Sequence, residues 1–171
     1  MENQPPRTMI EKIVEDIKNT FGEDCLVRYE NAGLQPVLSV NSNYLVQLCA
    51  WLRDHPHYHF DFLSNITAVD YYPEPRFAVV YNLASLPFQY QLTLRVELDN
   101  GRSPDHLPEL PSVSSVWRTA DWHEREAFDL MGVFFTGHPD LRRILMPDDW
   151  QGFPLRKDYE DPEEYHGIPI K

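Results

Sequence analysis

The sequence predicts an α+β fold in which a largely antiparallel sheet is covered by helices. From Tyr90 to Asp99, apolar residues alternate strictly with polar ones, which is typical of a strand with one buried and one wet face. From Ile10 to Phe21, apolar residues recur at helical spacing with charged residues opposite. A third pattern, a charged helix that ends at Gly132 and leads into a proline-punctuated extended arm, completes the expected fold.

The N-terminal part is expected to contain a helix and a strand pair. The helix from Ile10 to Phe21 should end at Gly22, since glycine is favoured just past a helix C-terminus. Residues 25–30 and 35–41 are rich in β-prone residues and are separated by Asn31-Ala32-Gly33. They are therefore predicted to pair as two strands.

A second helix follows, which Ser42 or Asn43 can cap and which stops before Pro56. Its buried stripe is predicted to be Leu45, Leu48, Cys49 and Leu52. Three alternating histidines come next and raise the possibility of a metal site: His55, His57 and His59. Because Pro56 makes the backbone irregular and no cysteine or carboxylate lies in matching register, a solvated loop is the favoured interpretation.

Three further strands are predicted at Phe60–Tyr72, Phe77–Leu83 and Tyr90–Asp99. Their short connections indicate an antiparallel meander, and the two early helices must cover its apolar face. Residues 100–115 are rich in proline, serine and aspartate and are expected to wrap around the sheet edge as a loop.

Composition excludes several functions. The 171 residues include 27 acidic and 15 basic ones, for a formal net charge of −12. Such a surface is wrong for binding nucleic acid or for lying directly on anionic lipid, although it suits a partner with basic patches. The N-terminus has no basic start or apolar core of a secretory signal, and no apolar run approaches the ~20 residues that span a bilayer.

The two cysteines, Cys25 and Cys49, are far apart in the sequence. An iron–sulfur cluster ordinarily takes four thiolates, and a structural zinc site takes four closely spaced ligands. Two buried, reduced thiols are therefore expected.

The segment Trp122–Tyr159 is the most distinctive part of the chain. Asp121 is the predicted N-cap of its helix, with Glu124 three residues later completing a capping box. Gly132 stands where a left-handed residue would end the helix.

Four charged residues of this segment suggest a salt bridge. Glu126 and Asp129 share a helix face, and Arg142 and Arg143 follow a turn at residues 137–140. We expect one of the carboxylates to pair with one of the arginines and to fold the loop back on the helix.

A catalytic or metal site built from His123, Glu126, Asp129 and His138 is also conceivable. The zinc-protease pattern fails, however, because Ala127 stands where the second histidine is required. The chain has no serine nucleophile elbow, phosphate-binding glycine loop or dinucleotide motif. Catalysis by this chain alone is therefore not expected.

The same segment contains a set of spaced motifs: Glu124-Arg125-Glu126, Asp129-Leu130-Met131, His138, Arg142-Arg143-Ile144-Leu145 and, further on, Pro154-Leu155-Arg156-Lys157-Asp158-Tyr159. In this order and spacing they resemble the signature of the 30 kDa (C) subunit family of respiratory complex I, the proton-translocating NADH:quinone oxidoreductase. The J-type protein of the chloroplast and cyanobacterial complexes and components of membrane-bound hydrogenases are related.

The resemblance implies a structural subunit of the peripheral, hydrophilic arm that packs on the 49 kDa-type (D) protein, which is similar to the large subunit of hydrogenases. It would support electron transfer from NADH to quinone, while NAD, FMN, iron–sulfur clusters and quinone are bound by other subunits. No catalytic, cofactor-binding or metal-binding residues carry over. The residues expected at the partner interface are Glu124, Arg125, Glu126, Asp129, His138, Pro139, Arg142, Arg143, Arg156, Lys157 and Tyr159.

The resemblance further implies a peripheral location on the cytoplasmic side of the bacterial inner membrane, with membrane contact only through the complex. One alternative is the equivalent subunit of a membrane-bound hydrogenase or of an NAD(P)H:plastoquinone-type complex. A free-standing metal-dependent hydrolase that uses the histidines is a less favoured alternative.

Three regions of the chain are expected. Residues 1–115 form the platform, residues 116–146 carry the signature helix and the loop with His138-Pro139 and Arg142-Arg143, and residues 147–171 form the extended arm. The arm is aromatic and charged but cannot build a core of its own. We expect it to dock on another protein as far as Tyr159 and to be disordered over the last few residues.

Overall fold

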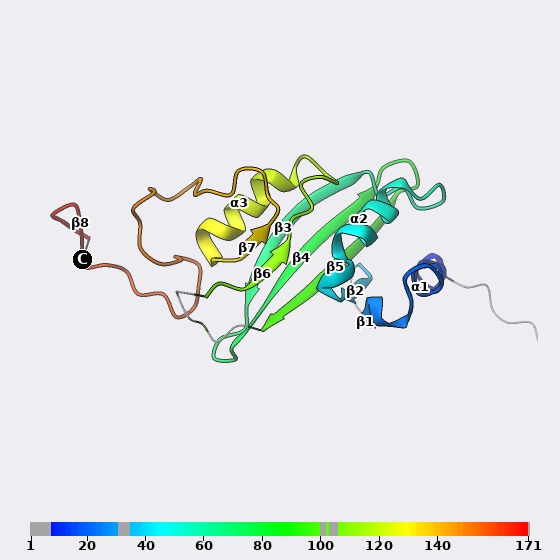
Figure 1. Ribbon diagram of the computed structural model, residues 1–171, viewed down its shortest axis with the longest axis horizontal. Helices are drawn as coiled ribbons and strands as arrows, with labels where there is room; N and C mark the ends of the chain where they lie inside the picture. Colours follow the sequence, from blue (N-terminus) through cyan, green and yellow to red (C-terminus); the bar gives the residue numbers. More distant parts are fainter. Residues whose placement is uncertain (1–7, 31–34, 100–101, 103–105, 171) are drawn as a thin grey trace, which may run out of the picture.

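A computed structural model describes residues 8–30, 35–99, 102 and 106–170 (Figure 1). Its centre is a five-stranded sheet made of β1 (Leu26–Glu30), β2 (Val37–Val40), β3 (Phe62–Asp70), β4 (Arg76–Ser85) and β5 (Tyr90–Asp99). The strand order is β1-β2-β5-β4-β3. The α+β fold with a largely antiparallel sheet is thus confirmed.

The predicted meander and strand pair are both present. Strands β3, β4 and β5 are antiparallel neighbours, and β1 pairs antiparallel with β2. The turn expected at residues 31–33 lies outside the described residues. In addition, β2 runs parallel to β5, with Val37 opposite Thr93, which joins the strand pair to the meander in one sheet.

Two helices precede the meander. Helix α1 (Met9–Phe21) starts with Thr8, whose N–H donates to Glu11 Oε2 at 2.8 Å, and it ends at Gly22 as predicted. Helix α2 (Leu45–Asp54) follows a short 3-10 turn over Ser42–Tyr44. The side chain that caps this turn is Asn41, which accepts the Asn43 N–H, so Ser42 and Asn43 are not the caps.

The helices and one face of the sheet enclose a single apolar core. Alternate residues of β4 and β5 point into it, among them Val79, Tyr81 and Leu94. On the opposite face Asn82 of β4 bonds to Asn65 of β3 and to Thr93 of β5, so polar side chains bridge the three strands of the meander. This alternation explains why the sheet carries its helices on one side only.

A third helix, α3 (Ala120–Met131), packs beside β3 and is flanked by a small parallel sheet of β6 (Glu109–Pro111) and β7 (Phe134–Thr136). The prediction that residues 100–115 form only a loop is therefore wrong. Leu110 pairs with Phe135, and both are buried, because this short strand closes the core next to α3.

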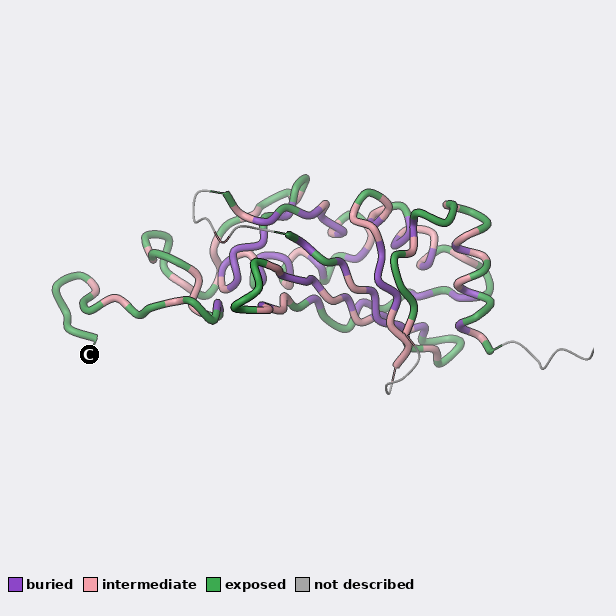
Figure 2. The backbone as a smooth tube through the Cα atoms, turned by 90° about the horizontal axis from the view of Figure 1, so that it is seen from below, coloured by how far each residue is buried: buried purple, intermediate pink, exposed green. Residues whose placement is uncertain are grey.

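The C-terminal segment leads away from the sheet and ends in a hairpin of β8 (Glu164–Tyr165) and β9 (Ile168–Pro169), at the far left of Figure 1. The expected disorder near residue 170 is thus replaced by a folded turn. Most of this segment is exposed in Figure 2. In the part of the chain that the structure describes, no helix has the length and apolar character needed to cross a bilayer.

Both cysteines are buried and free, as predicted. Burial raises the pKa of the Cys25 thiol to about 11 and also raises that of Cys49. The thiols are therefore protonated, and they pack as small apolar side chains.

Candidate functional site

The signature segment is organised around the carboxylate of Asp129 on α3. This fully buried side chain accepts three successive backbone N–H groups on Oδ2, from Ile144 at 3.0 Å, Leu145 at 2.7 Å and Met146 at 2.9 Å. Oδ1 accepts Arg143 Nη1 at 2.7 Å. Burial alone would raise the pKa of Asp129, but these donors lower it below its usual value, so the group is an anion that holds the loop in place.

Arg143 extends this network beyond the loop. Its Nη1 also donates to the Asp129 carbonyl at 3.0 Å, while Nη2 donates to the carbonyls of Trp150 at 2.9 Å and Gly152 at 3.0 Å. One guanidinium thus joins α3 to the start of the C-terminal segment. The predicted carboxylate–arginine pair is confirmed as Asp129–Arg143.

The other two residues considered for that pair lie elsewhere. Glu126 is exposed on the outer side of α3. Arg142 is exposed as well, and its Nε bonds to Asp140 at 3.0 Å.

Arg125 holds the same loop from its other side. Its Nε and Nη2 donate to the carbonyls of Arg142 and Arg143, each at 3.3 Å. The guanidinium lies 5.2 Å from the centre of the Trp122 ring, within cation–π range. Trp122 remains 59% exposed, so a buried arginine fixes an exposed aromatic side chain.

The C-terminal end of α3 is closed by Arg156. Its Nε donates to the carbonyl of Met131 at 2.8 Å and its Nη2 to that of Gly132 at 3.2 Å, which satisfies carbonyls that a helix end leaves without partners. The guanidinium also stacks on Phe153, 4.5 Å from the ring centre. Burial lowers the pKa of Arg156, with Asp158 the largest opposing influence.

Gly132 makes this close approach possible. It adopts the left-handed conformation predicted for it, with φ 67° and ψ 42°. A Cβ atom here would lie 2.6 Å from Arg156 Nη2 and 2.6 Å from the Phe153 ring. Both the backbone angle and the packing therefore require glycine.

A second buried carboxylate anchors the segment to the sheet. Asp70, at the end of β3, accepts the Lys157 N–H at 2.9 Å and the Tyr72 N–H at 2.9 Å, and it pairs with Arg102. Arg102 also bonds to Asp158 at 3.0 Å. Burial opposes ionisation of Asp70, but the guanidinium and the two N–H groups outweigh it and lower the pKa.

Glu124 is the third buried carboxylate, and it does not cap the helix. The N-cap is Thr119, and Asp121 lies in the first turn of α3, so the predicted capping box is wrong. The helix starts earlier because the preceding turn supplies carbonyls, such as that of Trp117, which accepts the Ala120 N–H at 3.0 Å.

The Glu124 side chain instead ties α3 to the end of β6. It accepts the Ser112 hydroxyl at 2.5 Å and the Val113 N–H at 2.7 Å. Burial and, to a lesser degree, the charge of Asp121 raise the pKa of Glu124 to about 7, although its two donors oppose this shift.

His138 lies next to Glu124, with a fully buried side chain. Its Nδ1 accepts the Asp140 N–H at 3.0 Å, so in the neutral ring Nε2 carries the proton and donates to the Asp121 carbonyl at 3.1 Å. The same nitrogen is 4.0 Å from Glu124 Oε2. His138 thus pins the turn before the two arginines against the first turn of α3.

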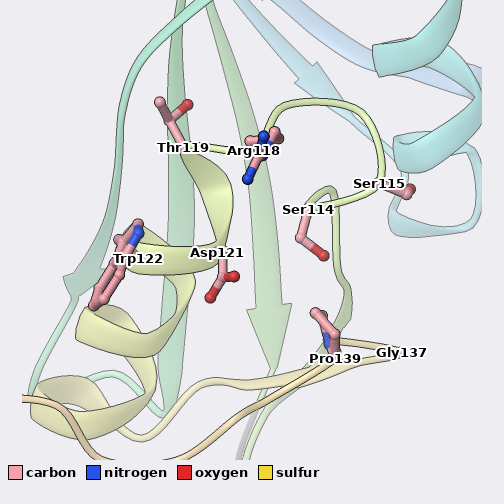
Figure 3. Close-up of a pocket in the computed structure, with 8 residues that line it drawn as sticks. All are labelled: Ser114, Ser115, Arg118, Thr119, Asp121, Trp122, Gly137 and Pro139. Atoms are coloured by element: carbon pink, nitrogen blue, oxygen red, sulfur yellow. The ribbon is translucent and has the colours of Figure 1, made fainter.

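A hollow of about 610 Å³ opens beside this turn (Figure 3). Asp121 and Trp122 project from different sides of the start of α3, and Pro139 lies across the hollow from the helix. Its walls mix polar and apolar residues: Ser114, Ser115, Arg118, Thr119, Asp121, Trp122, Gly137 and Pro139.

The residues considered for a catalytic or metal site, His123, Glu126, Asp129 and His138, do not form one. Glu126 faces solvent, Asp129 is occupied by the loop, and His123 Nδ1 is buried without a hydrogen-bond partner. Within the described ranges, no group of three or more histidine, cysteine, aspartate or glutamate side chains could hold a metal ion. His55 stacks on Tyr58, with ring centres 4.2 Å apart, in the loop after α2.

The expected interface residues therefore divide into two groups. Glu124, Arg125, Asp129 and Arg156 are buried and, like His138 and Arg143, bond within the chain. The exposed members are Glu126, Pro139, Arg142 and Lys157, while Tyr159 is half-buried. Asp70, Arg102 and Ser112 complete the network and were missed from the sequence, although an aspartate among the apolar residues of a strand was a signal.

Comparison with known proteins agrees with this signature. A family described as "Respiratory-chain NADH dehydrogenase, 30 Kd subunit" matches residues 38–165. The C-type subunit of the NADH-quinone oxidoreductase of Chlorobium phaeobacteroides is 40% identical over 158 residues, which cover 90% of each chain. Its counterpart in Geobacter sulfurreducens is 43% identical over 157 residues, covering 88% of this chain and 92% of the relative.

The fold has a solved counterpart in the membrane-bound sulfane sulfur reductase, an archaeal respiratory membrane complex. The TM-score is 0.72 at 20% identity, over 90% of this chain and 86% of the other. The fold likeness, the family match to the signature and the extent of the sequence identity lead to one assignment. This chain belongs to the family of the 30 kDa subunit of respiratory-chain NADH dehydrogenase.

Proposed function

We propose that this chain is a structural subunit of the peripheral arm of a proton-translocating NADH:quinone oxidoreductase and that it packs on the 49 kDa-type protein. The relatives named as the C-type subunit of this enzyme support the proposal. The main structural support for the proposal is that the buried charged side chains bond within the chain. Asp129 and Arg143 bind loop backbone and each other, so this buried pair holds the shape of a surface.

The partner surface in this proposal is formed by the exposed residues that the network positions. Trp122 offers an aromatic anchor held by Arg125, and Glu126 and Arg142 are exposed charges of the same segment. Large aromatic and arginine side chains contribute most to the affinity of protein interfaces, while charges set their register.

The cofactors follow from the same proposal. This chain binds none itself, and NAD, FMN, iron–sulfur clusters and quinone are held by other subunits of the complex. It would sit at the cytoplasmic side of the inner membrane and reach the membrane only through its partners.

Substitution of the exposed residues tests the proposal. Glu126→Ala and Arg142→Ala are expected to lower the amount of this chain that co-purifies with the 49 kDa-type protein, while the free energy of unfolding of the isolated chain changes by less than about 0.5 kcal/mol. Asp24→Ala, at an exposed position beside β1, is the matched control. A complex that forms at normal yield but turns over slowly would contradict an interface role.

The equivalent subunit of a related respiratory membrane complex is the second candidate. The fold likeness to the archaeal sulfane sulfur reductase supports it. Mass spectrometry of the subunits that co-purify with the native chain tests the two proposals, since the first requires an NADH-oxidising, FMN-binding subunit among them.

A further inference from the structure

Residues 163–170 form a hairpin with a tight two-residue turn. His166 and Gly167 both have positive φ, at 50° and 76°, which is the geometry of a type I′ turn. Tyr165 pairs with Ile168, and the Ile170 N–H donates to the Glu163 carbonyl at 3.0 Å.

The hairpin is connected to the hydrogen-bond network of Asp129 and Arg143, here called the signature network. Asp149 accepts the Tyr165 hydroxyl at 2.8 Å and lies 2.9 Å from His166 Nε2. The Tyr165 ring packs on Trp150, with centres 5.1 Å apart, and Arg143 binds the Trp150 carbonyl. A continuous set of contacts therefore runs from Asp129 on α3 through Arg143 to the hairpin.

The chain nevertheless leaves the hairpin largely uncovered. Ile168 is 67% exposed and Ile170 is 45% exposed, and the hydrogen bonds, ion pair and ring contacts of the hairpin join it to Asp149, to Trp150 and to itself. Figure 1 shows it projecting away from the sheet. A two-stranded hairpin is marginally stable in water, so an ordered, isolated one with exposed isoleucines calls for a covering surface.

We propose that this hairpin is a docking element that inserts Ile168 and Ile170 into an apolar depression, rimmed by lysine and arginine, on a neighbouring subunit. The charge of the partner follows from the hairpin's flank. Four exposed carboxylates form no ion pair within the described chain, and a basic rim would neutralise them: Glu160, Asp161, Glu163 and Glu164. A second copy of this chain, with its net charge of −12, would repel them.

This inference rests on the proposed membership of a respiratory complex. It specifies which residues dock and the chemistry of the surface that receives them. It also gives the Asp129–Arg143 pair the role of positioning the hairpin. Because the hairpin is already folded, less conformational entropy is lost on docking than for a disordered tail.

The test uses the full chain expressed with the other subunits of its complex. The double variant Ile168→Ser, Ile170→Ser is expected to reduce the chain retained in the purified complex about tenfold after dilution. Leu86→Ser, at a 63% exposed leucine in the β4–β5 turn, is the matched control and should leave retention unchanged.

Neutralisation tests the charge of the partner. The variant with Glu160→Gln, Asp161→Asn, Glu163→Gln and Glu164→Gln is expected to weaken retention at low salt and to flatten its dependence on salt. Asp24→Asn with Asp99→Asn, two exposed acids elsewhere on the chain, should do neither.

A photoreactive benzoylphenylalanine at position 168 identifies the surface directly. In the purified complex it should cross-link to a peptide of one other subunit that contains lysine or arginine. Cross-links only to this chain or to a second copy would overturn the inference, as would equal retention of the hairpin variants and their controls. If the wild-type chain itself does not enter the complex, the proposed function fails, whereas failure confined to the hairpin variants leaves it intact.

Discussion

At the scale of single residues, a few buried charges determine the shape of the signature segment. The Asp129 carboxylate accepts three consecutive backbone N–H groups of an irregular loop. It thus takes the place of the carbonyl acceptors that a regular helix or strand would provide. Backbone N–H groups are costly to bury without partners. The signature is therefore in large part a folding requirement, and only its exposed residues are free to contact other proteins.

Asp129→Ala is expected to lower the free energy of unfolding by about 3–5 kcal/mol, since it removes the ion-pair partner of Arg143 and the acceptor of three backbone N–H groups. Urea denaturation of the isolated chain measures this. Glu126→Ala, three residues away on the exposed side of the same helix, should change the value by less than about 0.5 kcal/mol. Similar losses for the two variants would disprove the role assigned to Asp129.

Glu124 makes the stability of the chain depend on pH. Its pKa is raised to about 7 in the folded chain, against 4.5 for an ordinary glutamate, so its contribution to stability is complete below about pH 4.5 and is lost as the pH rises through 7. The difference corresponds to roughly 3 kcal/mol.

Glu124→Gln removes this titration. The free energy of unfolding of the wild type should therefore fall relative to that of the variant between pH 5 and pH 8, when both are measured in parallel by denaturation. A constant difference across this range would show that Glu124 keeps an ordinary pKa in the folded chain.

At the scale of elements, sequence patterns predicted those helices and strands whose formation depends on neighbouring residues. The alternation in β5, the stripe of α1 and the glycine that ends α3 were all readable from the sequence. A pair between one of Glu126 and Asp129 and one of Arg142 and Arg143 was also predicted, and the structure shows which of them it is, Asp129–Arg143.

The missed features depend on contacts between distant parts of the chain. The parallel pairing of β2 with β5 brings together residues about 55 positions apart, which no local pattern specifies. The burial of Glu124 depends on Ser112, which reaches it only because β6 pairs with β7. The early start of α3 likewise comes from the carbonyls of the preceding turn.

The end of α3 offers a test at this scale. Gly132→Ala is expected to cost about 3 kcal/mol, because it adds a strained backbone angle and a clash with Arg156 and Phe153. Gly137 has a similar φ of 79°, but a Cβ atom there would have no other atom within 4 Å. Gly137→Ala should therefore lower the free energy of unfolding by only about 1 kcal/mol. Thermal denaturation compares the two, and equal losses would mean that the packing at Gly132 is unimportant.

At the scale of the whole molecule, the C-terminal segment has two parts with different roles. Residues 150–158 lie against the chain itself through Arg143, Arg156 and Asp70. Residues 159–170 contact mainly one another and the neighbouring loop. The sequence placed a division near Tyr159 but gave the parts other roles, with docking on another protein up to Tyr159 and disorder over the last few residues. The three-dimensional contacts instead bind the first part to this chain and fold the second into a hairpin.

Two truncations examine this division. A chain that stops after Asp158 loses the hairpin and Tyr159 but keeps the bonds of Arg156 to Met131 and of the Lys157 N–H to Asp70. Its free energy of unfolding should stay within about 1 kcal/mol of the full chain, since surface segments with few contacts contribute little.

A chain that stops after Met146 loses those bonds as well, together with the carbonyl acceptors of Arg143. It leaves Asp70 with fewer donors and the carbonyls at the end of α3 without partners, so we expect a loss of about 4 kcal/mol or more. Urea denaturation of both truncated chains beside the full chain measures the difference. If the shorter chain were as stable as the longer one, residues 147–158 could not be part of the folded unit, and the signature network would end at Met146.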